Sequence, residues 1–126
     1  MTALTRGAEV LVLIVACLSC EGGRTAQSRG VPVGGDASRG ERVILAAGCG
    51  ACHVIPGVRG AHGVVGPGLA GLRERTFIAG HLANTPDALV RWIMTPRVFE
   101  PQTAMPELGL TEHQARDVAA YLYTLD

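Results

Sequence analysis

The chain has 126 residues, and its eleven Arg balance eleven Asp and Glu, so the formal net charge is zero and no Lys is present. This balance argues against nucleic acid or an anionic membrane surface as a partner, because both attract a large field of positive charge. The length allows one small domain. Only two Phe, two Tyr and one Trp are available for its core, so a bound cofactor would help to complete it.

The N-terminal segment is typical of an export signal. Arg6 precedes the apolar run Val10–Ala16, which is too short to cross a bilayer but suits a secretory signal peptide. The run leads into Cys17 as Ile-Val-Ala-Cys, which resembles the lipobox of bacterial lipoproteins. That resemblance implies a signal peptide over residues 1–16 and a lipid on Cys17. An ordinary cleaved signal or an uncleaved anchor helix is the alternative.

The following residues, 17–35, are predicted to form a lipid-anchored flexible linker. From Glu21 to Gly35 the chain is rich in Gly and small polar residues and lacks apolar periodicity. The folded domain is therefore placed at residues 36–126. We expect an exported protein that stays concentrated on the periplasmic side of a bacterial membrane through its N-terminal lipid.

The motif that carries chemistry runs from Cys49 to His53 and has the C-x-x-C-H spacing of c-type haem attachment. The Cys49 and Cys52 thiols can form thioethers to the two vinyl groups of a porphyrin. The adjacent His53 is then placed beneath the iron as its proximal ligand. The cofactor expected is one covalently attached haem c.

Two other interpretations of the Cys pairs are less favoured. A zinc site would need Cys17 and Cys20 together with Cys49 and Cys52, but the first pair lies at the end of the export signal. A thioredoxin-like redox pair would need a strand before the motif, and no strand-rich pattern precedes it.

The sixth position on the iron is expected to be filled by Met105. A thioether opposite His53 favours ferrous iron and raises the reduction potential. Met105 lies between Pro101 and Pro106, in a stretch expected to be an irregular loop, whereas Met94 falls on a helical apolar face where packing is the ordinary role. Ligation by a second His stays open, and the candidates are His62, His81 and His113.

Three helices are predicted from capping patterns and apolar periodicity. Their expected N-terminal capping residues, in chain order, are Asp36 or Ser38, Thr85 and Thr111. The first should end near Ala47 and the second before Pro96, while Gln114 completes a capping box for the last. No alternating strand pattern is found. We therefore expect an all-α fold in which the first and last helices cross and Gly-rich loops surround the haem.

The order of these parts resembles the class I cytochromes c over Asp36–Leu125. The resemblance rests on the C-x-x-C-H motif, a Gly-Pro-x-Leu segment beginning at Gly66, the pair Met105-Pro106, and a C-terminal helix with Ala-Tyr-Leu at residues 120–122. Within that family, the pattern from Ala79 to Ile93 is most similar to the cytochrome c domain fused to subunit II of some bacterial terminal oxidases.

This resemblance implies roles for further residues around the haem. The Pro67 carbonyl should accept a hydrogen bond from His53 Nδ1–H and so orient the imidazole. Arg75, Asn84 and Trp92 are implied as donors to the haem propionates. Each has an ordinary alternative, respectively a solvated charge, a helix cap and a core side chain.

The predicted function is a single-electron carrier that is not itself an enzyme. It would receive electrons from one redox protein and deliver them to another, such as a membrane-bound terminal oxidase. Because Lys is absent, a strongly salt-dependent encounter with an acidic partner is not expected. The enzymatic alternative is a peroxidase or gas sensor, which would need an acid–base group near the iron, with His62 and His81 as candidates.

Overall fold

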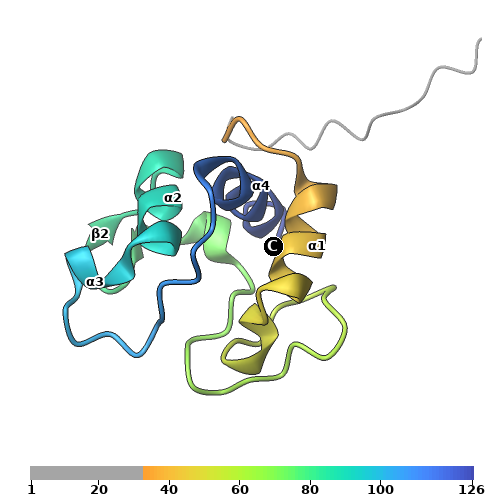
Figure 1. Cartoon of the computed structure of the whole chain (residues 1–126), viewed down its shortest axis with the longest axis horizontal. Helices are drawn as coiled ribbons and strands as arrows, with labels where there is room; N and C mark the ends of the chain where they lie inside the picture. The colour runs from red at the N-terminus through yellow and green to blue at the C-terminus, as the bar shows by residue number, and fades with distance from the viewer. Residues whose placement is uncertain (1–32) are drawn as a thin grey trace, which may run out of the picture.

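The computed structural model describes residues 33–126. The predicted signal peptide, the lipidation site Cys17 and most of the predicted linker lie outside these residues. The elements are α1 (Ala37–Ala46), a 3₁₀ turn (Cys49–Ala51), a second 3₁₀ turn (Leu72–Glu74), β1 (Phe77–Ile78), β2 (Leu82–Ala83), α2 (Pro86–Met94), α3 (Pro96–Phe99) and α4 (Glu112–Leu122). In Figure 1, α4 lies between α1 and α2 and packs against both.

The three predicted helices are confirmed, and each begins at a capping residue named from the sequence. The Asp36 side chain accepts a hydrogen bond from the Arg39 amide, so Asp36 rather than Ser38 caps α1. Thr85 caps α2, which ends before Pro96. Thr111 and Gln114 form the complete capping box of α4. The fold is the mostly helical one expected.

The expectation that no strand is present was wrong in one place. β1 and β2 form a short antiparallel hairpin in which Phe77 pairs with Ala83 and Ile78 pairs with Leu82. Its turn contains Ala79 and Gly80, both in the left-handed region with φ of 51° and 81°. Strands of two residues each are too short to carry an alternating pattern.

The boundary predicted between residues 35 and 36 also needs correction. Val33 is only 4% exposed, and its carbonyl accepts a hydrogen bond of 3.1 Å from Arg116 Nη1. Gly35 lies so close to the backbone of Arg116 that an added Cβ would overlap it. The folded domain therefore includes residues 33–35, which pack on α4.

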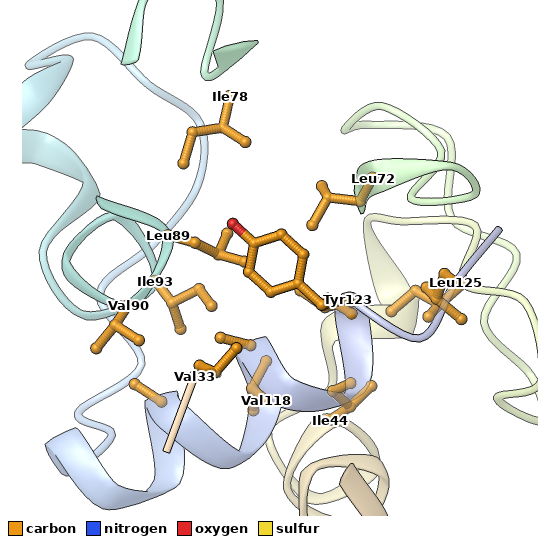
Figure 2. Packing of buried hydrophobic residues seen from close by; sticks show 14 of the residues in the cluster. Val33, Ile44, Leu72, Ile78, Leu89, Val90, Ile93, Val118, Tyr123 and Leu125 are labelled. Carbon is orange, nitrogen blue, oxygen red and sulfur yellow. The ribbon is translucent and has the colours of Figure 1, made fainter. Parts of the chain in front are cut away.

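The helices α1 and α4 cross at Gly40, where a side chain would overlap the Asp117 carbonyl. Beneath this crossing lies an apolar core to which α1, α2 and α4 all contribute. In Figure 2 the Tyr123 ring projects from the end of α4 into the middle of the labelled side chains. The buried core residues are Val33, Ile44, Ile55, Val58, Ala61, Leu72, Ile78, Ala88, Leu89, Val90, Ile93, Ala115, Val118, Ala119, Leu122, Tyr123 and Leu125.

A buried carboxylate, Asp117, joins the start of the domain to α4. It accepts hydrogen bonds from the Asp36 amide at 2.7 Å and from Arg39 Nε and Nη2 at 2.9 and 3.0 Å. His113 Nδ1 lies 3.4 Å from its Oδ2. Burial alone would raise the pKa of Asp117, but the hydrogen bonds from Arg39 and Asp36 outweigh it and lower this pKa. The carboxylate is therefore ionised and stabilising at neutral pH.

Replacing Asp117 with Asn should lower the free energy of unfolding at pH 7 by about 1–3 kcal/mol. The low end is favoured because the Arg39 side chain is 46% exposed. A denaturant titration of the complete holoprotein measures this loss. The control is Glu112→Gln, which removes only an exposed ion pair to Arg116 and should cost about 0.5 kcal/mol or less. Equal losses in the two variants would contradict the role given to Asp117.

The same substitution should weaken the acid sensitivity of the fold. Because the folded-state pKa of Asp117 is lowered, its contribution is present above the unfolded-state value of about 3.9. That contribution is lost as the pH falls through the folded-state pKa. Asp117→Asn should therefore lose less stability than the native protein on acidification below about pH 4.

Candidate haem site

A cavity of about 580 Å³ opens between α1, α2, α4 and the loops that connect them. Its size lies within the range of about 300–1,000 Å³ typical of small-molecule sites. Apolar side chains from the three helices, for example Ile44, Leu89 and Val118, form part of its wall, and residues of the connecting loops and turns form the rest. Four potential haem-binding residues named from the sequence line it together, namely Cys49, Cys52, His53 and Met105. An apolar ring with two vinyl groups and a central metal fits these walls.

The C-x-x-C-H motif follows directly from the end of α1. Gly48 adopts a left-handed conformation with φ of 72°, which ends the helix and begins the tight turn at Cys49. The amides of Cys52 and His53 both donate to the Cys49 carbonyl, at 3.2 and 3.1 Å. Both thiols are unpaired and, with the imidazole, line one cavity. Burial raises the pKa of the Cys49 thiol, so this thiol is protonated at neutral pH.

The His53 ring is held by the Gly-Pro segment that follows. His53 Nδ1 lies 2.7 Å from the Pro67 carbonyl oxygen, which is the contact that the family resemblance implies. Because a carbonyl only accepts, Nδ1 carries the proton and Nε2 keeps the lone pair that a metal needs. Gly66 packs against the ring face so closely that a Cβ would overlap His53 Cε1. The local backbone therefore sets both the tautomer and the orientation of the imidazole.

Another part of the cavity wall comes from the loop between α3 and α4. Met105 lines the cavity together with its neighbours Ala104 and Pro106, and its amide donates to Thr103 Oγ1 at 3.2 Å. Met94 does not line the cavity and instead packs, partly buried, against the apolar core. The structure thus separates the two methionines as the sequence interpretation did, although iron ligation by Met105 stays a prediction.

The histidines proposed as alternatives lie elsewhere. Of the four histidines, all within residues 33–126, only His53 lines the cavity. His62 and His81 are exposed, and the His81 ring contacts the Ala79 carbonyl at 2.9 Å. His113 is also exposed and lies beside Asp117. Within the same residues, no three His, Cys, Asp or Glu side chains gather as a metal ion would require.

The three residues implied as propionate donors differ in their placement. Arg75 and Trp92 line the cavity, so their predicted roles stand as predictions. Asn84 does not line it, and both of its N–H donors point to backbone carbonyls, those of Leu72 at 2.7 Å and Arg75 at 2.8 Å. The contacts therefore argue against Asn84 as a propionate ligand and give it a structural role.

The sequence interpretation missed several residues that line the cavity. Phe77 and Ile78 reach it from the β1–β2 hairpin, and Glu100 reaches it from the end of α3. The Glu100 carboxylate accepts a hydrogen bond of 3.2 Å from the Gln102 amide. None of these residues belongs to a motif, and a two-residue strand has no periodicity from which its buried side could be inferred.

A methyl group added at Gly66 tests how tightly the proximal ring is held. Gly66→Ala should displace the His53 imidazole and reduce the amount of haem bound per protein several-fold, as measured by absorbance. Gly68→Ala is the matched control, because its added Cβ would meet only Val54 Cβ at 4.0 Å, an ordinary contact. Normal haem binding in both variants would show that the ring is not confined as described.

Comparison with known proteins places these features in a family. A family model described as cytochrome c matches residues 37–126. Cytochrome c oxidase subunit 2 of Alkalihalophilus pseudofirmus is 31% identical over 90 residues, which cover 71% of this chain and 25% of that protein. Cytochrome c-type cyt cy of Rhodobacter capsulatus is 38% identical over 100 residues, which cover 72% of this chain and 50% of that protein.

The chain thus spans a quarter of one relative and half of the other. The family match begins at the first residue of α1 and includes every element that borders the cavity. By sequence, by fold and by the residues around its cavity, the chain belongs to the cytochrome c family.

Proposed function

We propose that this protein is a membrane-tethered single-electron carrier with one haem c, bonded to Cys49 and Cys52 and ligated by His53 and Met105. One observation carries the proposal. The two thiols, the imidazole and the thioether, which come from two distant parts of the chain, all line a single apolar cavity. Family membership supports the same cofactor.

In such a site the haem supplies one-electron redox chemistry, and the protein's residues set the conditions for it. The apolar walls exclude water and lower the local dielectric around the ring. The Pro67 carbonyl holds the His53 Nδ1 proton and increases the basicity of Nε2. The soft Met105 thioether favours ferrous iron and so raises the reduction potential.

Electrons would enter and leave at the mouth of the cavity. Val65 and Phe77 line the cavity and are nevertheless 71% and 55% exposed, respectively. Side chains that share a cavity and the surface in this way mark an edge that a docked redox protein can approach. Because this edge is apolar and the chain contains no Lys, its encounters should depend only weakly on salt.

A carrier is favoured over an enzyme by the placement of the acid–base candidates. His62 and His81, which the enzymatic alternative needs near the iron, are exposed and do not line the cavity. The oxidase subunit among the relatives suggests a respiratory complex, such as a terminal oxidase, as the electron acceptor. We therefore propose that the protein delivers its electrons to such a complex.

The axial ligands can be tested by absorption spectroscopy. Replacing Met105 with Ala should abolish the weak band at the red end that arises from charge transfer between Met sulfur and ferric iron. The iron should then become high-spin. Met94→Ala is the matched control and should keep the native spectrum, because Met94 lies outside the cavity. Met105 would not be the iron ligand if the band were lost in Met94→Ala but kept in Met105→Ala. A high-spin spectrum of the native protein would also contradict ligation by Met105.

The membrane tether rests on the sequence around Cys17 and has a separate test. Among residues 33–126, no helix combines the length and apolar character required to cross a bilayer. A lipid on Cys17 would hold the domain at the membrane, so Cys17→Ser should move the haem protein to the soluble periplasmic fraction. Cys20→Ser is the control and should stay membrane-bound. Retention of both variants would point to an uncleaved anchor helix instead.

A further inference from the structure

Both polar atoms of the Asn84 side chain form hydrogen bonds within the domain. Its Nδ2 donates to the Leu72 and Arg75 carbonyls at 2.7 and 2.8 Å. Its Oδ1 accepts from the Tyr123 hydroxyl at 2.7 Å. Because the two carbonyls can only accept, the orientation of the amide is determined and Tyr123 must be the donor to it. Asn84 thus connects the second 3₁₀ turn to the end of α4.

Tyr123 gives this connection a rigid anchor. The residue is 3% exposed, and its amide donates to the Ala119 carbonyl at 3.0 Å, which continues the hydrogen bonding of α4. Its ring projects among the core side chains in Figure 2. Burial raises the pKa of Tyr123, so the hydroxyl keeps its proton at neutral pH and remains a donor.

The segment that Asn84 holds is the proximal loop, residues 67–75. Arg75 Nη2 donates to the Gly68 carbonyl at 2.5 Å and to the Ala70 carbonyl at 2.9 Å, and so ties the end of the loop to its beginning. The loop starts at Pro67, whose carbonyl holds the His53 Nδ1 proton. A continuous series of short contacts therefore leads from Tyr123 through Asn84 and the proximal loop to the imidazole.

We propose that Asn84 and Tyr123 are positioning residues for the proximal ligand His53. They fix the proximal loop, and the fixed loop holds the Pro67 carbonyl at hydrogen-bond distance from the ring. Loosening the loop weakens that hydrogen bond, makes the imidazole a poorer donor to ferric iron and raises the reduction potential. This inference rests on the proposed function, because it takes His53 as an iron ligand.

The test uses the complete holoprotein and the variant Tyr123→Phe, which removes one oxygen atom. The reduction potential should shift to more positive values. The exchange of the His53 ring N–H proton, followed by NMR, should accelerate about tenfold, as the loss of one hydrogen bond of about 1.4 kcal/mol predicts. A purely structural role in the core would lower stability without moving either quantity.

Tyr121→Phe is the matched control. It also removes one tyrosine hydroxyl near the C-terminal end of α4, but the Tyr121 hydroxyl donates to the Pro56 carbonyl at 2.9 Å, outside the proximal loop. The reduction potential and the exchange rate of the His53 ring N–H proton should therefore remain native in this variant. If Tyr123→Phe and Tyr121→Phe lower stability alike and neither moves the potential, the inference is overturned.

The variant Asn84→Ala extends the test to the second member of the pair. It should raise the potential at least as much as Tyr123→Phe does. The double variant should go no further than Asn84→Ala alone, because Tyr123 acts through Asn84; additive shifts would contradict the pair. Absence of haem from the native protein would overturn the proposed function together with this inference. If the native protein binds haem but Tyr123→Phe does not change its reduction potential, this inference is overturned and the proposed function is not.

Discussion

The constraint on which the rest of the structure depends is the apolar cavity at the centre of the domain. Core residues such as Ile44, Leu89 and Leu122 are buried and also face this space. A cavity of about 580 Å³ represents many lost contacts for the side chains around it, and interiors of proteins are otherwise closely packed. With few aromatic side chains in the chain, an apolar cofactor is the group that completes the core. We therefore expect stability and function to depend on the same ligand.

The helices and the loops have different roles around this cavity. Contacts that join α1 to α4, at Gly40 and at Asp117, fix the framework and include no residue that would touch the iron. The loops supply the proposed iron ligands, and their irregular backbone is held by hydrogen bonds such as that from Asn84 to Arg75. An electron carrier benefits from this arrangement, because a rigid site changes little between its two oxidation states.

Local patterns in the sequence were sufficient for α1, α2 and α4 and for the haem motif, but not for the single turn of α3. The caps at Asp36, Thr85 and Thr111 are decided by a few neighbouring residues, and C-x-x-C-H is a contiguous motif, so both are readable from the chain alone. Features that depend on distant partners were not readable. Val33 is buried because it packs against α4, where Arg116 donates a hydrogen bond to its carbonyl. Asn84 does not line the cavity, and its side chain is hydrogen-bonded to Tyr123, a residue 39 positions away.

Intact mass spectrometry of the mature protein tests most directly whether an iron porphyrin is bonded to the two sulfurs of the motif. The native protein should carry the mass of one haem that survives denaturation. The double variant Cys49→Ala/Cys52→Ala should lack this mass and should fail to fold cooperatively, since its core is incomplete. A native protein with the mass of the polypeptide alone would contradict the account, as would a folded, cooperative variant without haem.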